Sequence, residues 1–464
     1  MLTLSAGQAE CLWDEALPVE VRELPRDLAA LDLLLSDPGL LGPIVERFRR
    51  EVSESGRAVL TDGRPTIAME SFIRLMVLKA RYRWGYRTLA AEVSDSIHLR
   101  RFCRISLSER VPDESTIRKL TRRLGPETVS ELTRMLIASA TREKRFRARA
   151  VRVDSTVIEA DVKYPTDAGL AAQGVRALAR EGRRLGQRIG ESERRVRDRS
   201  RAIGRRLRGI TRTIRARSGE AKAEVLKLTA QTGELLQRSV REARRLAKLA
   251  RAKARGQGAQ GKLKAAAKLE QLADRCEKVA SQITKRVQGE PISNRIVSLS
   301  DPDARPIRKG KLGKPTEFGY VTQLAEVTEN TKRGARGLIL PASTAPGNPS
   351  ENTLLPGTVA ELERLQISPR EFAFDGGFMP GPTKEALEEL TPERVFISGR
   401  QEPGSRRTNR RLQRYRTGKE GRISHLKRRY GMGRSRLKGK EGQEIWTEWA
   451  ILAYDADTLA VRAR

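Results

Sequence analysis

Three carboxylates and two cations have the types and the spacing needed for metal-assisted chemistry on a phosphodiester. Asp154 lies in the run AVRVDSTVIEADV and Asp375 lies in EFAFDGGF, two short apolar segments typical of buried strands. Further along the chain, Arg416, Glu420 and Lys427 are separated by four and seven residues. On a helix this spacing puts all three within an arc of about 60°. The pattern indicates two carboxylates on strands and a third on a helix, flanked by cations.

The chemistry of this set favours divalent cations. Burying a carboxylate in an apolar strand is costly unless it is paired or binds a metal, and a cation relieves the repulsion within a carboxylate cluster. Oxygen ligands without His or Cys favour Mg²⁺ or Mn²⁺. We therefore expect Asp154, Asp375 and Glu420 to be catalytic and to hold two such ions. Two ions can activate a water or a 3′-hydroxyl for in-line displacement, so no nucleophilic side chain is needed.

Other carboxylates are weaker candidates for this site. Asp161 and Asp167 lie beside a proline and are expected in a turn or a helix cap. Glu159 is an odd number of residues from Asp154, so we expect it on the opposite face of the strand. A later amphipathic helix carries three more, which we expect to be exposed: Glu441, Glu444 and Glu448.

The chain of 464 residues carries a net charge of +34, and this charge is concentrated in two stretches. Residues 171–290 hold 33 Lys and Arg against 12 Asp and Glu, and residues 401–440 hold 15 against 2. Such localised basicity indicates surfaces for a polyanion. Residues 171–290 contain no Phe, Trp or Tyr, which disfavours a membrane surface. We therefore expect double-stranded DNA as the partner, with Arg416 and Lys427 as DNA-binding residues at phosphates.

The remaining composition disfavours several classes of site and location. Cys11, Cys103 and Cys276 are far apart and odd in number, which predicts neither a disulfide framework nor a zinc site. The only histidines are His98 and His425, so His-ligated zinc and Ser-His-Asp catalysis are poorly supported. The N-terminus lacks the basic and apolar regions of a signal peptide, and no apolar run approaches ~18 residues. We expect a cytoplasmic protein without a membrane span.

Helical periodicity dominates residues 66–125. Apolar residues recur at helix spacing in AMESFIRLMVLKARYRW, and Asp113 is the expected N-cap of VPDESTIRKLTRRLG. The apolar residues of this second segment share one face, while Arg118, Lys119 and Arg122 lie elsewhere and are expected to bind DNA. A basic helix with one apolar stripe is typical of the second helix of a helix-turn-helix. An ordinary surface helix in a bundle is the alternative.

The basic stretch 171–290 has heptad-like spacing of apolar residues, which predicts long antiparallel or self-associating helices. Breaks are expected at Ser218-Gly219 and at 256–261, leaving about three helices of unequal length. A solvated coiled-coil spacer and a clamp along DNA phosphates are both compatible with this pattern. The net charge favours the clamp.

The sequence after residue 148 predicts an α/β core that the basic helices interrupt. A strand is expected at 148–164, and strands alternate with helices from NRIVSLS, at 294–300, to the C-terminus. We expect the following organisation: an N-terminal segment of unclear role at 1–65, an all-α DNA-binding domain at 66–147, the two parts of the core at 148–170 and 291–464, and the basic insertion at 171–290.

With these motifs, the chain resembles the DDE transposases of bacterial insertion sequences. Their glutamate motif reads Tyr, two residues, Arg, three residues, Glu, six residues, Lys, and the last three positions match Arg416, Glu420 and Lys427. The tyrosine position holds Gln413, and Tyr415 follows two residues later. DSTVIEADVKYPTDAGLAAQGVRALAR and HLKRRYGMGRSRLKG are similar to ISNCY-type transposases, and GYRTLAAEVSDSIHLRRF with VPDESTIRKLTRRL resembles the N-terminal domain common in these enzymes.

The resemblance implies a ribonuclease-H-like catalytic core with Asp154 on the first strand, Asp375 on a later strand and Glu420 on a helix. It implies cleavage at the terminal inverted repeats of a mobile element and joining of its 3′ ends to target DNA. At least a dimer is then expected when two ends are brought together. Two alternatives remain: a purely hydrolytic nuclease with the same core, and a non-catalytic, domesticated DNA-binding protein.

Overall fold

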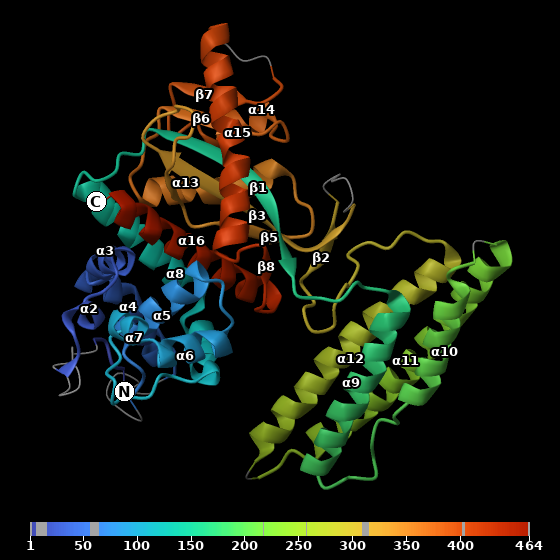
Figure 1. Cartoon of the computed structure of the whole chain (residues 1–464). Helices are drawn as coiled ribbons and strands as arrows, with labels where there is room; N and C mark the ends of the chain where they lie inside the picture. The colour runs from blue at the N-terminus through green and yellow to red at the C-terminus, as the bar shows by residue number, and fades with distance from the viewer. Residues whose placement is uncertain are drawn as a thin grey trace. The chain divides into compact units, whose positions relative to one another are not determined.

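The structure is a computed structural model that describes residues 2–5, 16–55, 65–216, 218–256, 258–308, 315–400 and 404–462. The chain forms two compact units, in which Val162–Gly319 interrupts the unit made of Met1–Asp161 and Tyr320–Arg464 (Figure 1). The first unit combines helices with a mixed β-sheet, so the α/β class is confirmed.

Helices form the N-terminal part of the first unit. They are α2 (Val19–Arg22), α3 (Arg26–Leu35), η1 (Pro38–Leu41), α4 (Gly42–Ser55), α5 (Met69–Arg81), α6 (Tyr86–Asp95), α7 (Ile97–Phe102) and α8 (Glu114–Arg142). The apolar periodicity of α5 places Phe72 and Leu75 in the core, as predicted. Arg74 is also buried there, and its guanidinium pairs with Asp32 of α3 at 2.5 Å and with Glu70 at 3.2 Å. The contact with Asp32 joins α3 to α5, and the contact with Glu70 lies within α5.

The start of α8 is as predicted, but its end is not. Asp113 caps the helix by accepting hydrogen bonds from the backbone amides of Ser115 and Thr116. The helical path does not stop at Gly125; it bends there and resumes at Pro126. Gly125 has φ of +73°, which glycine adopts without strain. Proline is favoured at the first position of a new helix, so this Gly-Pro pair acts as a kink.

The sheet of the first unit is built around two long strands. Its elements are β1 (Ala150–Ala160), β3 (Glu317–Thr328), β4 (Leu338–Ile339), β5 (Ser343–Pro346), β6 (Glu371–Phe374), β7 (Arg394–Ile397) and β8 (Arg434–Ser435). β6 and β8 pair parallel with β1, and β7 pairs parallel with β6. β3 lies on the other side of β1 and pairs antiparallel with β4 and β5.

Alternation along β1 directs its side chains to two different helical layers. Val151 and Val153 join the main apolar core, which also contains residues of α5, α8 and α16 (Gly439–Arg462). Ala150 lies in a small cluster with Leu412 and Tyr415 of α15 (Arg406–Arg429). Even-numbered residues at the start of β1 therefore face α15, which crosses β1 and β6 (Figure 1). The remaining helical elements of this unit are η2 (Glu351–Leu354), α13 (Leu355–Arg364) and α14 (Pro380–Ala386).

The second unit is a bundle of four helices with one apolar core. Its helices are α9 (Asp167–Arg188), α10 (Ser200–Thr213), α11 (Gly219–Ala252) and α12 (Ala259–Gln288). In addition, β2 (Arg305–Ile307) pairs antiparallel with the first residues of β3. The two predicted breaks are confirmed, but the predicted number of about three helices is wrong because the chain also breaks between α9 and α10. Val196 keeps the heptad spacing across that break, yet it lies in the loop and packs on Gly182.

Two other local expectations are wrong, and a third residue has contacts that the sequence did not indicate. Residues 294–300 form no strand; Ile296 and Leu299 are instead buried in the core of the helical bundle. Glu448 is buried rather than exposed, and one of its carboxylate oxygens accepts the backbone N–H of Ala342 at 2.9 Å. Asp167 opens α9 and pairs with Arg286 and Arg295. Buried charges of this kind leave the pattern of apolar residues unchanged, which is why the sequence concealed them.

Candidate functional site

Strand pairing brings the first two predicted carboxylates together. The parallel register of β1 and β6 pairs Val153 with Phe374, so the next step along both strands sets Asp154 beside Asp375. Asp154 is half-buried on the face that α15 covers, and its Oδ1 accepts the backbone N–H of Ser155 at 2.7 Å. The register therefore places two carboxylates at one point of the sheet.

The setting of Asp154 makes its negative charge costly. The pKa of this carboxyl is raised to about 6, chiefly by burial and also by the neighbouring charges of Asp375 and Glu351. The Lys419 ammonium and the Ser155 amide act in the opposite direction. Near neutral pH the group is ionised, and a cation beside it would relieve the cost of that charge.

Glu420 lies on α15, which is continuous from Arg406 to Arg429. Gly418 and Gly421 therefore do not interrupt this helix. Arg416 lies one turn before Glu420, and its guanidinium donates to Asp375 Oδ1 at 2.8 Å and to Glu420 Oε1 at 3.1 Å. Arg416 is 11% exposed at its side chain, whereas Glu420 is 61% exposed. The arginine thus bridges the second and third carboxylates.

The other predicted cation of the motif is anchored to the sheet. Lys427 Nζ donates to the backbone carbonyl of Val157 in β1 at 2.8 Å. This contact holds the C-terminal half of α15 against the strand that carries Asp154. Contacts of Lys427 and Arg416 with DNA phosphates stay predictions.

The tyrosine position of the motif also has a structural partner. Gln413 accepts a hydrogen bond from Ser398 Oγ at 2.9 Å, which ties α15 to the residue after β7. Tyr415 is buried, and its hydroxyl lies 2.7 Å from Thr328 Oγ1 of β3. Tyr415 therefore faces the sheet and stabilises the packing of α15 on it.

A buried ionic network lies beside the carboxylate pair, and sequence reasoning missed it. Arg152 of β1 contacts Glu326 of β3 at 2.9 Å, and its guanidinium also donates to the carbonyl of Tyr415 at 2.7 Å. Arg422 of α15 pairs with the other oxygen of Glu326 at 3.0 Å. The paired arginines hold the pKa of Glu326 below its usual range although burial alone would raise it. These residues come together only because β1, β3 and α15 are adjacent in the fold. No local sequence pattern predicts such a network.

Lys419 is the buried cation closest in sequence to Glu420. Burial lowers its pKa to about 7, and among the described residues its Nζ has no hydrogen-bond partner. The charges of Glu326 and Asp154 favour its protonated form. Glycine at 418 allows α15 to pack closely on Arg152, because a Cβ at this position would lie 2.3 Å from Arg152 Nη1.

The carboxylate oxygens of this site are ligands that hard divalent cations prefer. For all three carboxylates to bind one cation, however, a side chain must move. Asp154 and Asp375 supply adjacent carboxylate oxygens, and Glu351 acts on the same point electrostatically. Within the described residues, no group of three or more His, Cys, Asp or Glu side chains is arranged to hold a metal ion. Arg416 occupies the space between Asp375 and Glu420, so joining Glu420 to the pair requires that its guanidinium move.

The predicted DNA-binding cations of α8 are all exposed. Arg118 approaches Glu114 at 3.4 Å, and Arg122 donates to the backbone carbonyl of Lys438 at 3.2 Å. Lys119 is exposed on the same helix. Residues 103–113 connect α7 to α8, a link longer than the ~3–4-residue turn of a helix-turn-helix. DNA contact by these three residues stays a prediction.

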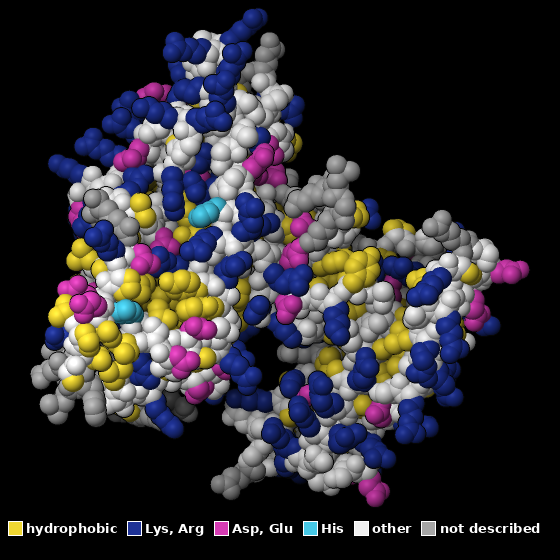
Figure 2. All heavy atoms as spheres, in the orientation of Figure 1, with side chains coloured by type: hydrophobic (Ala, Val, Ile, Leu, Met, Phe, Trp, Pro, Cys, Tyr) yellow, Lys and Arg dark blue, Asp and Glu magenta, His cyan; other side chains and the backbone are white. Residues whose placement is uncertain are grey.

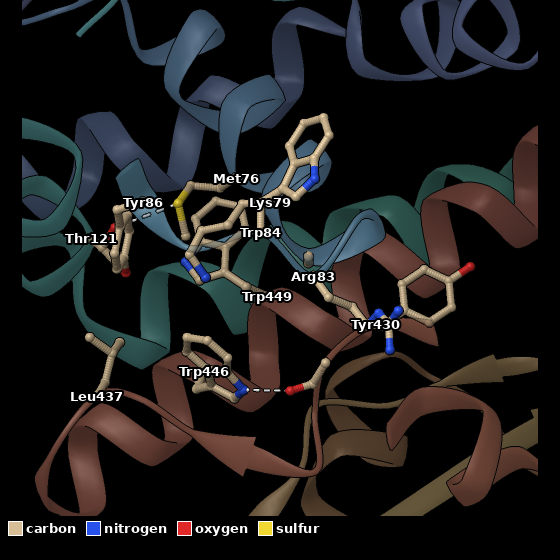
Figure 3. A pocket seen from close by; sticks show the side chains of 12 residues that line it. Met76, Lys79, Arg83, Trp84, Tyr86, Thr121, Tyr430, Leu437, Trp446 and Trp449 are labelled. Carbon is tan, nitrogen blue, oxygen red and sulfur yellow. Dashed lines mark hydrogen bonds between the residues drawn. The ribbon is translucent and has the colours of Figure 1, made fainter. Parts of the chain in front are cut away.

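A second buried lysine lies where α5 and α6 meet α16. Lys79 Nζ lies 4.0 Å from the ring centre of Trp446 and 4.7 Å from that of Tyr86, inside a small cavity that Trp449 also lines (Figure 3). Trp446 in turn donates to the carbonyl of Gly431. Burial lowers the pKa of Lys79 to about 7, and the ring faces partly offset that cost. This cluster joins the N-terminal helices to the helix that backs the sheet.

Among the described residues, one bent pair of helices has the combined length and apolar composition of a membrane span. Within the described parts of the chain no single helix has the length and apolar composition to cross a membrane; Arg26–Leu35 and Pro38–Glu54 meet the criterion only jointly, across a bend of 66°.

Comparison with known proteins gives one match. A family model described as a transposase domain (DUF772) covers residues 39–123, which run from η1 into α8. No curated protein and no solved structure shows a significant match. The family match supports a transposase, and hence an enzyme that processes DNA.

Proposed function

We propose that the chain is a DDE transposase with a ribonuclease-H-like catalytic core of the ISNCY-like kind, in which Asp154, Asp375 and Glu420 hold two Mg²⁺ or Mn²⁺ ions. The observation that carries this proposal is the β1–β6 register, which sets Asp154 beside Asp375 on the face covered by the helix of Glu420. The resemblance implies a carboxylate on the first strand, one on a later strand and one on a helix; Asp375 departs from this by one residue, because β6 ends at Phe374.

The metal ions, when bound, would activate a water or a 3′-hydroxyl of the DNA as the nucleophile and stabilise the leaving oxygen. The protein's own residues have separate tasks. Asp154 and Asp375 provide the fixed part of the site, because both are placed by hydrogen-bonded strands. Glu420 completes it when Arg416 releases its carboxylate, and the freed guanidinium is then available for a DNA phosphate. Arg152, Glu326 and Lys427 hold α15 on the sheet.

The substrate in this proposal is double-stranded DNA bearing the element's terminal inverted repeats, and a second duplex is the target. The α8 face with Arg118, Lys119 and Arg122 is the proposed contact with the terminal repeats. Two ends must be brought together, so the acting species is at least a dimer.

A strand-transfer assay with pre-cleaved element ends and a plasmid target tests the proposal. Joined product that requires Mg²⁺ and is lost in Asp154→Asn supports a transposase. Cleavage without joining would instead support a hydrolytic nuclease of the same fold. DNA binding with neither activity, unchanged by Asp154→Asn, would support a domesticated binder.

A further inference from the structure

Helix α10 of the second unit carries a row of arginines that no described residue neutralises. Arg201, Arg205, Arg208 and Arg212 recur at spacings of four, three and four, which places them within an arc of about 60° on a helix. All four are exposed, and none makes an ion pair or a side-chain hydrogen bond with any residue that the structure describes. The row extends over three helical turns.

The opposite side of α10 is fixed to the bundle. Ile203 is buried in the core of the unit and Leu207 packs against it. Gly209, on the flank of the helix between the row and this apolar side, lies close to α11, since a Cβ there would be 2.8 Å from Leu228 Cδ1. The apolar positions are offset from the arginine row by roughly 180°, so the row points away from the bundle. Figure 2 shows Lys and Arg side chains gathered along the outer edge of the helical unit, where α10 lies in Figure 1.

Some of the other exposed arginines of the same unit have acidic partners, although Arg176, Arg238 and Arg241, for example, are exposed without a described ion pair. Four examples come from α9, the following loop and α11: Arg184 pairs with Glu181, Arg194 with Glu191, Arg244 with Glu277, and Arg251 with Glu270. Helix α10 contains no Asp or Glu at all. Like charges at i and i+4 destabilise a helix by about 0.2–0.5 kcal/mol per pair. The row therefore carries a local cost that nothing within the described fold offsets.

We propose that this row, Arg201, Arg205, Arg208 and Arg212, is a binding surface for the sugar-phosphate backbone of duplex DNA, engaged without regard to sequence. The choice of DNA rests on the proposed function. A lipid surface fits less well, because the row has no flanking aromatic side chain and residues 171–290 contain none. Arginine forks bind phosphate oxygens in pairs of hydrogen bonds, so four exposed guanidinium groups suit four phosphates.

The test compares two quadruple variants of the full chain, each with four positive charges removed. One is Arg201→Gln/Arg205→Gln/Arg208→Gln/Arg212→Gln, and the other neutralises the paired residues: Arg184→Gln/Arg194→Gln/Arg244→Gln/Arg251→Gln. Fluorescence anisotropy measures binding to a labelled duplex of unrelated sequence, without divalent metal, across a salt series. A third variant with lysine at the four α10 positions keeps the charge.

Neutralising the row should reduce the slope of log Kobs against log[salt] by about 3.6, since each phosphate contact contributes about 0.9. The paired-arginine variant should lose less than half of that, and the lysine variant should keep the slope of the parent. Circular dichroism and thermal melting check that each variant is folded, and removal of like charges should leave the α10 variant at least as stable.

Equal losses in the two quadruple variants would overturn the proposal, because the effect would then belong to overall charge. So would an unchanged slope, or a selective loss of binding to phosphatidylserine vesicles with duplex binding intact. The proposed catalytic function fails by a different measurement, the strand-transfer assay with Asp154→Asn. A row that binds duplex in a protein without strand transfer would still stand.

Discussion

Arginine serves opposite purposes in the two units of this protein. In the sheet unit, Arg152 is fully buried, and its guanidinium is shared among Glu326 and two backbone carbonyls. In the helical unit, Arg201, Arg205, Arg208 and Arg212 of α10 are exposed and have no carboxylate partner within the described fold. A buried charge must be paired to be tolerated, whereas an exposed charge is available to a partner. The first kind positions a site, and the second kind can recruit a substrate.

The largest effect is expected at the carboxylate pair. Asp154→Asn removes a proposed metal ligand and should lower the rates of cleavage and joining by about 10³-fold or more, equivalent to several kcal/mol. Glu159→Gln is the matched control, because Glu159 is on the same strand and pairs with Arg434. The rate of strand transfer in Mg²⁺ measures both. Equal activity of the two variants would remove Asp154 from the site.

Asp154→Asn should also stabilise the fold above pH 6. The folded-state pKa of this carboxyl is raised to about 6, so between about pH 4 and 6 the folded state binds more protons than the unfolded state. Stability is therefore lost as the pH rises through this window, and it stays lost above it. Removing the charge should recover about 2 kcal/mol at pH 7. Urea unfolding of the variant and the parent at pH 4 and pH 7 checks the sign.

The contrast between buried and exposed arginines predicts unequal costs of removal. Arg152→Met leaves a buried carboxylate short of a partner and should lower the free energy of unfolding by about 3–5 kcal/mol. Arg244→Met breaks exposed pairs with Asp274 and Glu277 and should cost less than about 1 kcal/mol. Denaturant melts of both variants make the comparison. A similar loss for each would contradict the distinction between the two regions.

Two glycines of α15 provide a matched pair of substitutions that tests whether the surroundings of a residue decide its effect on stability. Gly418→Ala puts a methyl group 2.3 Å from the Arg152 guanidinium, which its partners hold in place, and should destabilise the protein by about 1–3 kcal/mol. A Cβ at Gly421 meets nothing within 4 Å, so Gly421→Ala should stabilise the helix by about 0.5–1 kcal/mol. Opposite shifts in the melting temperature are the expected result, and equal shifts would show that helix propensity alone matters.

A pH dependence of metal binding is also expected. Protons compete with the cation for Asp154, so below pH of about 6 the apparent Kd for Mg²⁺ should rise about tenfold per pH unit. Mg²⁺ titrations of strand transfer between pH 5 and 8 measure it. Loss of affinity toward high pH instead would implicate a group other than this carboxyl.

Several elements could be read from the sequence because local periodicity and capping carry them. The apolar face and Asp113 cap of α8 are confirmed, as are the strand around Asp154, the strand just before Asp375 and the two breaks of the basic insertion. The break between α9 and α10 was concealed, because Val196 keeps the heptad spacing from within a loop. Apolar periodicity records which residues are buried, but it does not record whether the backbone between them is helical.

The sequence by itself determined the identities and order of the candidate carboxylates, the charge of the insertion and the faces of its helices. Only the tertiary structure decided that Arg416 bridges Asp375 and Glu420, and that Arg152, Glu326 and Lys419 lie buried beside Asp154. It also decided which arginines have acidic partners and which do not. The physical reason is that ion pairs join elements far apart in the chain, and their strength depends on burial and distance, which no local pattern of residues encodes.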